Sequence, residues 1–423
     1  MSRIGFCRRD ITPPIGMGLG GYAGHRPCTG VHDRLFCRAV VLEQAGTLYG
    51  LAALDLMCAD NSLWEYIARR VADLGIARER LVVSAIHSHS APAGVIPEEG
   101  ELASINRVIL PRTPGYAAYM ESVVRAAAEA LAEAAGNLEA FQIRSGRGPA
   151  PAVGSERHTG GYAFAELTAI QCRTDSGKNL ILYNFPCHPT VMSPANLLVS
   201  ADLVGGIEGQ LEGDMAVFLN GAAGDISTRF TRREASFSEC ARMGCLAAET
   251  VRTLLSDKPF TEPGPLTGLS GTVQLQARAV QPEAEARQKL SDATARWRQA
   301  EEAGVDPGTL RIHKSYVEGA GVNLEFSQTM GDLRLLNLPV RVFRFAGFDF
   351  ITVPGELYST LLPEGASAIC YANGYYRYIA DRAAYDAGHY EAMAAILAPG
   401  QGEQLKDAIT RLLRQLDQQE EML

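Results

Sequence analysis

Two histidines that stand two positions apart could hold a metal ion. His87 and His89 lie in the segment Ile86–Gly94, after an apolar run that predicts a strand buried on both faces. Side chains two positions apart share one face of a strand, and α/β sheets build their sites at the carboxyl ends of strands. The pair indicates a metal site, and two histidines hydrogen-bonded near a strand end are the alternative.

A histidine and a glutamate follow two further apolar strands. His188 stands in the segment Asn184–Thr190 between two prolines, and Glu356 follows a Pro-Gly pair. Zinc accepts imidazole nitrogens and carboxylates, and a catalytic zinc leaves one position to water. Taken singly, His188 is more often structural, and Glu356 could begin a helix and favour its positive end. Beside His87, both would complete a metal site.

Two other segments carry groups that could stabilise an oxyanion. The small-residue loop Asn220–Ser227 follows a strand, and its N–H groups could line a carbonyl pocket. The loop lacks the patterns of a phosphate loop and of an esterase elbow, so Ser227 alone is typical of a loop residue. Five tyrosines gather between Tyr375 and Tyr390. Phenols can donate to an oxyanion or bind a metal, and a packed surface is the alternative.

Alternating strands and helices must position these groups, which predicts an α/β fold. We expect one large layered α/β domain over residues 1–423, with mixed sheets and an inserted helical hairpin. The charged segment Gln281–Ala303 predicts a solvated helix of that hairpin, which we place at about residues 279–320. The other elements that we predict are strands at 34–42, 48–56, 81–87, 164–172, 179–186, 216–219, 335–345 and 348–353, and helices at 62–74, 116–135, 236–255 and 401–416.

Composition excludes several classes of protein. The 423 residues are 47% hydrophobic and 21% charged, which excludes disorder or a coiled coil over the whole chain. A net charge of −9 without a basic cluster argues against nucleic-acid binding. We find no transmembrane segment and no export signal, and nine cysteines without a CxxC pair suit a reduced cytoplasm. We expect a cytoplasmic enzyme with a small-molecule partner, and leave homo-oligomerisation open.

The ordered set of motifs resembles the N-terminal catalytic domain of the neutral/alkaline non-lysosomal ceramidase family. The matching segments run in the same order over nearly the whole chain, and include the His-x-His-Ser element and the Tyr-rich tail. They are Asp10–Pro14, Met17–Tyr22, Gly30–Leu35, His87–Ser90, Cys187–Thr190 with Ser200–Asp202, Asn220–Ser227 and Val353–Glu356.

The resemblance implies a zinc ion and a role for each matched residue. The implied zinc ligands are His87, His188, Glu356 and Tyr378. The implied catalytic residues outside the ligand set are His89, Ser227, Arg157 and the oxyanion-side phenol of Tyr390. Asn220 and Tyr385 would contact the substrate.

The resemblance predicts a zinc-dependent amidohydrolase that cleaves an N-acyl amide by metal-activated water, with His89 as the acid. In a rival mechanism Ser227 attacks and forms an acyl-enzyme. Because this chain lacks the export signal and immunoglobulin-like domain of known ceramidases, we expect a soluble substrate. The alternatives are a zinc-dependent esterase, an N-acyl-sugar deacylase, and a non-catalytic metabolite-binding relative.

Overall fold

An eight-stranded mixed sheet forms the centre of the molecule. The computed structural model describes residues 2–96, 113–161, 165–331 and 333–421. The two halves of the sheet meet where β1 and β6 pair over only two residues each, so the sheet divides there. In spatial order its strands are β11 (Met215–Asn220), β9 (Asn179–Phe185), β8 (Glu166–Thr174), β6 (Glu139–Pro149), β1 (Ser2–Asp10), β3 (Phe36–Gln44), β4 (Thr47–Leu54) and β5 (Leu81–Ala85).

The hairpin of β3 and β4 confirms the prediction made for residues 34–56. Gln44 pairs with Thr47, which leaves Ala45 and Gly46 as a two-residue turn. Both turn residues have positive φ, 50° and 78°, as the tight hairpin turn that matches strand twist requires. The predicted strand at 164–172 is β8, although Phe164 lies outside the described residues.

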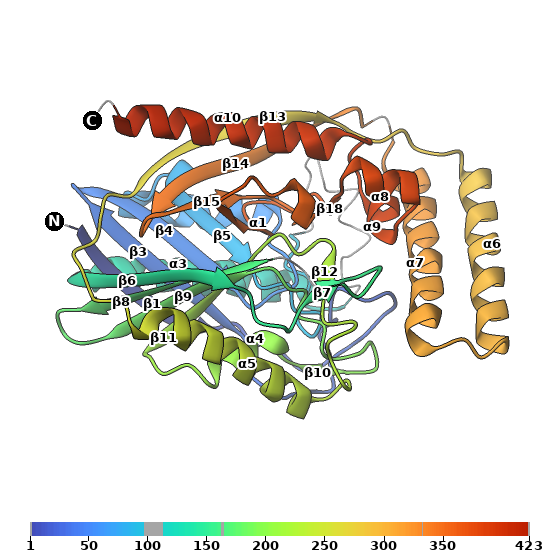
Figure 1. Cartoon of the computed structure of the whole chain (residues 1–423), viewed down its shortest axis with the longest axis horizontal. Coiled ribbons are helices and arrows are strands. Elements are labelled where there is room, and N and C mark those ends of the chain that lie inside the picture. The colour runs from blue at the N-terminus through green and yellow to red at the C-terminus, as the bar shows by residue number, and fades with distance from the viewer. Residues whose placement is uncertain (1, 97–112, 162–164, 332, 422–423) are drawn as a thin grey trace.

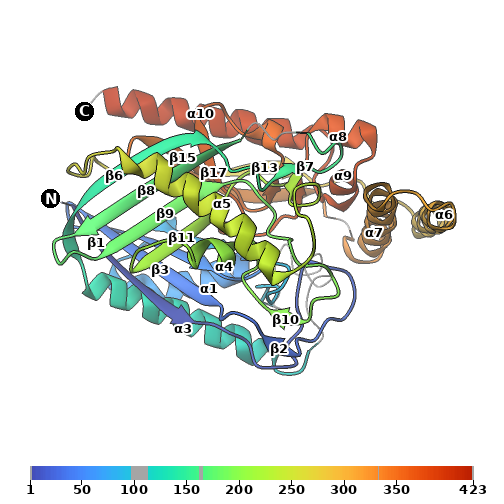
Figure 2. The ribbon, with the colours of Figure 1, turned by 60° about the horizontal axis from the view of Figure 1, so that its bottom comes forward.

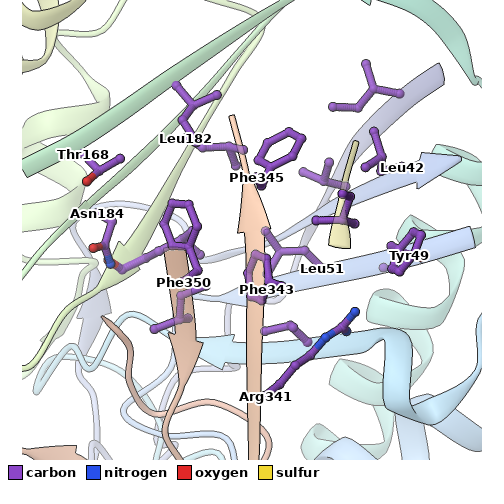
Figure 3. A pocket seen from close by; sticks show the side chains of 18 of the residues that line it. Leu42, Tyr49, Leu51, Thr168, Leu182, Asn184, Arg341, Phe343, Phe345 and Phe350 are labelled. Atoms are coloured by element: carbon purple, nitrogen blue, oxygen red, sulfur yellow. The ribbon is translucent and has the colours of Figure 1, made fainter. Parts of the chain in front are cut away.

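A second sheet of four strands packs against the first. Its order is β13 (Thr267–Gln276), β14 (Leu335–Phe345), β15 (Phe348–Thr352) and β17 (Ala366–Ile369). Side chains such as Ile4, Leu182 and Phe350 form one apolar cluster between the sheets. This cluster contains a gap of about 100 Å³. Figure 3 shows Phe343, Phe345 and other apolar side chains around it. None of the predicted site residues lines this gap, so we treat it as part of the core.

Helices cover the outer faces of both sheets (Figures 1 and 2). Helices α3 (Tyr116–Gly136), α4 (Leu203–Glu208) and α5 (Phe237–Ser256) lie on the large sheet, and α1 (Asn61–Val71) packs on α3. Helix α10 (Gln401–Glu421) lies along β13 and β14. The layered α/β fold is therefore confirmed. Among the described residues, no helix combines the length and apolarity needed to cross a bilayer.

The charged segment forms the predicted helical hairpin, which stands at one end of the molecule (Figure 1). It consists of α6 (Glu283–Glu302) and α7 (Pro307–Thr329), which pack along each other. The carboxylate of Asp306 accepts hydrogen bonds from the N–H groups of Gly308 and Thr309 and caps α7. Helix α7 contacts α9 (Tyr390–Ala394), which follows α8 (Arg382–Ala387).

The sequence patterns did not predict β1, β6 or β13. Strand β1 carries Arg3 and Arg9, and charged side chains argue against a central strand when the sequence is read alone. Arg3 pairs with Glu43 of β3, and Arg9 pairs with Glu133 of α3. These ion pairs depend on tertiary neighbours and leave no periodic signal in the strand itself.

Candidate metal centre

His87 and His89 come together through a turn and not through strand geometry. We predicted that both lie on one strand face, but β5 ends at Ala85 and the two histidines follow it. His87 has a φ of 72°, in the left-handed region, which is unusual for a non-glycine residue. Its Nδ1 donates to the carbonyl of Met57 at 2.7 Å, which directs Nε2 towards Nε2 of His89 at 3.2 Å. Such strained backbone is found most often at functional sites.

His188 reaches the same point from the end of β9. Its Nδ1 lies 2.6 Å from the carbonyl oxygen of Ala223 and 3.1 Å from that of Ile226, so this nitrogen carries the proton. Its Nε2 faces Glu356, with Oε2 2.9 Å away, and is the nitrogen available to a metal ion. A backbone carbonyl behind Nδ1 is the usual support of a metal-binding imidazole.

Glu356 completes the group from a third segment. The alternative that Glu356 begins a helix is wrong, because it begins the short strand β16 (Glu356–Leu357), which pairs in parallel with β18 (Tyr378–Ile379). Its Oε2 lies 3.4 Å from Nε2 of His87, and its Oε1 accepts a hydrogen bond from the phenol of Tyr375. Burial raises the pKa of this carboxyl, but His87 and His188 outweigh burial and hold it well below its usual value.

His89 is a neutral imidazole beside this group. Burial and the neighbouring His87 and His188 lower its pKa well below the ordinary value. Its Nδ1 is buried and has no hydrogen-bond partner among the described residues. The ligand atoms of His87, His89 and His188 all lie within 4.8 Å of one another, so His89 can either join the metal or exchange a proton.

Tyr378 lies beside the group, with its hydroxyl engaged by an arginine. Its ring stacks on that of His188, with centroids 6.3 Å apart and an interplanar angle of 13°. Its hydroxyl accepts a hydrogen bond from Nη1 of Arg157 at 3.1 Å. The ring of Tyr390 meets Tyr378 edge-on at 5.7 Å. The phenol that contacts Glu356 directly is Tyr375, which we noted in the sequence but did not assign.

A cavity of about 830 Å³ opens onto these side chains. Of the ten predicted site residues, the structure brings seven to its wall, and His188 lies directly behind Glu356. The seven are His87, His89, Arg157, Ser227, Glu356, Tyr378 and Tyr390. A concave space with convergent polar groups and shifted pKa values is the arrangement typical of an active site.

Asn220 and Tyr385 do not line this cavity, although we predicted that both contact substrate. The amide of Asn220 donates to the carbonyls of Ile86 and Cys187, each at 3.1 Å, and its oxygen accepts from the N–H of Cys187. Asn220 therefore joins the residues that precede His87 and His188, which makes it a positioning residue. The hydroxyl of Tyr385 donates to the carbonyl of Leu397 at 2.6 Å, as expected of a packed phenol.

Glu391 is a buried acid that the sequence did not single out. Its Oε1 lies 3.0 Å from Nη1 of Arg157, and its Oε2 lies 2.9 Å from Nε2 of His158. Burial raises the pKa of Glu391, but Arg157 and His158 lower it by more than burial raises it, which brings it to about 2. In the sequence, only its position next to Tyr390, a predicted site residue, could have pointed to Glu391.

Comparison with known families agrees with this geometry. Residues 3–231 match the profile of the N-terminal domain of neutral/alkaline non-lysosomal ceramidase. The chain belongs to this family. It is therefore a ceramidase-like hydrolase that acts on linear amide C–N bonds. The ceramidase family is metal-dependent, and the imidazole and carboxylate groups described here are donors that a divalent metal accepts.

Two solved structures share the ceramidase fold of this chain. The neutral ceramidase of Pseudomonas aeruginosa is 17% identical, with a TM-score of 0.74 over 97% of this chain and 74% of that chain. A ceramidase complexed with C2 is 17% identical, with a TM-score of 0.72 over 96% of this chain and 74% of that chain. No curated protein matches the chain.

Proposed function

We propose that this ceramidase-family chain is a zinc-dependent amidohydrolase that cleaves the N-acyl bond of a soluble small molecule. The observation that carries the proposal is the convergence of Nε2 of His87, Nε2 of His188 and Oε2 of Glu356 beside the cavity. Tyr378, which stacks on His188, is the proposed fourth ligand. A zinc ion held there would polarise the amide carbonyl and lower the pKa of a water molecule.

The ligand set fits zinc because each histidine presents a free Nε2. The protons of His87 and His188 lie on Nδ1, where backbone carbonyls accept them. The carboxyl of Glu356 is ionised, since its pKa is held well below the usual value. Two imidazoles and one carboxylate are a known donor set of catalytic zinc.

The remaining side chains of the cavity would manage protons and charge. We assign His89 to proton transfer, because its neutral Nε2 can take up a proton from the attacking water and return it to the departing nitrogen. Arg157 holds the hydroxyl of Tyr378, and Tyr390 lies against the same ring. We assign the phenol of Tyr390 to stabilising the negative oxygen of the tetrahedral intermediate, where one donor is worth about 3 to 4 kcal/mol.

Ser227 is the alternative nucleophile. It is buried on the cavity wall, and the N–H of Arg229 donates to its Oγ at 3.4 Å. Among the described residues, no histidine or carboxylate forms a hydrogen bond with this hydroxyl. An activated serine needs a base within hydrogen-bond reach, so we favour water as the nucleophile.

The test measures metal content and amide cleavage together. Purified protein is expected to hold about one zinc ion per chain by elemental analysis, the content of a mononuclear catalytic site. Dialysis against a chelator should abolish amine release from N-acyl substrates, and added zinc should restore it. Metal-free protein that cleaves amides at the full rate would contradict the proposal. Cleavage of esters alone would favour the esterase alternative, and cleavage of only short-chain ceramide would contradict the soluble substrate.

A further inference from the structure

The inserted hairpin forms one wall of the catalytic cavity. Helix α7 contributes Arg311, Lys314, Glu318, Val322 and Glu325 to the same space that His87 and Glu356 line. The helix also packs on α9, which carries Tyr390. The hairpin is thus placed to contact whatever substrate reaches the metal centre.

The cavity wall carries an excess of positive charge. Seven arginine and lysine side chains line it against three glutamates among the described residues, although the whole chain has a net charge of −9. Of these glutamates, Glu356 faces the metal centre and Glu318 pairs with Arg311 at 3.0 Å. A cationic cavity in an acidic protein concentrates anionic ligands by electrostatic focusing.

Three of the cations serve the fold or the catalytic groups, and a fourth, Arg377, also has a partner within the chain. The guanidinium of Arg26 donates to four backbone carbonyls, those of Pro194, Gly20, His89 and Asn196. Arg157 is paired with Glu391, and Arg232 donates to the carbonyls of Thr190 and Val191. These side chains are held by partners within the protein, although Nε of Arg157 has no hydrogen-bond partner among the described residues.

Arg229, Arg311 and Lys314 differ, because Arg311 pairs with Glu318 through one nitrogen only, and Arg229 and Lys314 form no ion pair among the described residues. Nη1 of Arg311 is buried without a hydrogen-bond partner among the described residues. Arg229 forms no ion pair within the described part of the chain, and its Nη1 donates only to the carbonyl of Arg157. Lys314 lies over the ring of Trp297 at 3.8 Å. Burial, together with nearby Arg157 and Arg311, lowers the pKa of Arg229 to about 10.

These incompletely paired positive groups raise the free energy of the ligand-free cavity, and they favour the binding of an acidic ligand. A buried N–H group without a partner loses its hydrogen bonds to water, and like charges in one cavity repel. A carboxylate or phosphate would accept the missing hydrogen bond and reduce the repulsion between the cations. A guanidinium presents paired N–H donors that match the oxygens of either group. The neutral amide of an N-acyl compound would not balance these charges.

We propose that Arg229, Arg311 and Lys314 bind an anionic group of the substrate, so that the enzyme acts on acidic N-acyl compounds. The inference rests on the proposed function, because it names the substrate of the same site. An acidic substrate would distinguish this chain from an enzyme that acts on neutral ceramide. The hairpin thereby becomes the element that determines specificity.

The test compares pairs of substrates of which one member carries an anionic group and the other is neutral. N-hexanoylglycine and N-hexanoylglycinamide form a carboxylate pair, and N-hexanoyl-O-phosphoethanolamine and N-hexanoylethanolamine form a phosphate pair. We expect kcat/KM to favour the acidic member of at least one pair by about tenfold or more, the value of a charge-assisted hydrogen bond. The pair with the larger preference identifies the anion.

Variants assign the preference to the named residues. Arg229→Gln and Arg311→Gln should each reduce the preference for the acidic substrate by about tenfold, and Arg311→Lys should keep more of it. Arg296→Gln is the matched control, because it removes one exposed charge from α6 of the same hairpin, away from the cavity wall. Circular dichroism checks that each variant is folded.

Calorimetric titration with the same compounds separates the two proposals. If the acid binds through Arg229 and Arg311 but no amide is cleaved, the anion site stands and the proposed hydrolysis is wrong. If the neutral amides are cleaved as fast as the acidic ones, the hydrolysis stands and the anion site is wrong. Absence of both cleavage and binding would overturn both.

Discussion

Oε2 of Glu356 lies 2.9 Å from Nε2 of His188, although 168 positions separate the two residues in the chain. Both side chains are buried, and His188 is supported from behind by the carbonyl of Ala223. Burying a carboxylate is costly unless cationic or metal partners balance it. The fold nevertheless holds these two distant segments together. The free-energy cost of burying the carboxylate is expected for a preformed metal site.

The first prediction concerns metal content. His188→Ala should release the metal and lower kcat by at least about a hundredfold, because one of the proposed ligands is lost. Inductively coupled plasma mass spectrometry of the purified variant measures the metal, and amine release measures turnover. His32→Ala is the control, because His32 is exposed and stacks on Phe237 away from the site. A variant that keeps both metal and turnover would exclude His188 as a ligand.

The second prediction concerns the positioning role of Asn220. Asn220→Ala leaves the carbonyls of Ile86 and Cys187 without their donor. We expect metal affinity to fall about 10- to 100-fold, as for losses around metal ligands, and stability to fall by about 1 to 3 kcal/mol. Competition with a fluorescent zinc chelator measures the affinity. A matched change at exposed Asn137 should alter neither quantity.

If Asn220 instead contacts the substrate, as the family resemblance implied, Asn220→Ala would raise KM while metal affinity stays constant. The two measurements together therefore decide between the positioning role and the substrate-binding role.

Local patterns predicted much of the fold. The hairpin of β3 and β4 followed from two apolar runs separated by a short polar turn, and the charged helix α6 followed from its charge on most faces. The histidines and Glu356 were found because each follows an apolar strand. These features depend on residues that are close in sequence, where period and turn chemistry are informative.

Features that depend on distant partners could not be predicted. The choice between Tyr375 and Tyr378 as the phenol that contacts Glu356 depends on the pairing of β16 with β18. It also depends on the backbone of the segment between them, where Asn373 and Arg377 have φ values of 60° and 59°. Asparagine is enriched at positive φ, so Asn373 before Gly374 carried a weak signal, but no pattern in a single sequence predicts a left-handed arginine such as Arg377. The pairing of Arg157 with Glu391 could not be predicted either, because the two residues are far apart in the sequence.

The third prediction concerns acid stability. The pKa of Glu391 is about 2 in the folded protein, because Arg157 and His158 outweigh its burial. A lowered pKa stabilises the fold above the pKa of the unfolded chain, near 4.5, and this contribution is lost as pH falls towards 2. The shift corresponds to roughly 3 kcal/mol. The difference in unfolding free energy between wild type and Glu391→Gln should therefore narrow as pH falls from 6 to 3.

Urea denaturation at several pH values measures this difference. Glu285→Gln, which removes an exposed acid from α6, should show no such convergence. A difference between wild type and Glu391→Gln that stays constant with pH would show that Arg157 does not stabilise the ionised form.

The fourth prediction distinguishes water from Ser227 as the nucleophile. The hydroxyl of Ser227 accepts a weak hydrogen bond from the N–H of Arg229 at 3.4 Å, and no base among the described residues contacts it. Removing an activated serine nucleophile costs on the order of 10⁶-fold in kcat, so a much smaller loss in Ser227→Ala excludes that role. We expect a loss below about a hundredfold, typical of one lost polar contact.

Rapid-quench measurements on the wild type should show no burst of amine, because no acyl-enzyme accumulates. A burst equal to the enzyme concentration that disappears in Ser227→Ala, but not in the surface variant Ser238→Ala, would establish the serine mechanism instead.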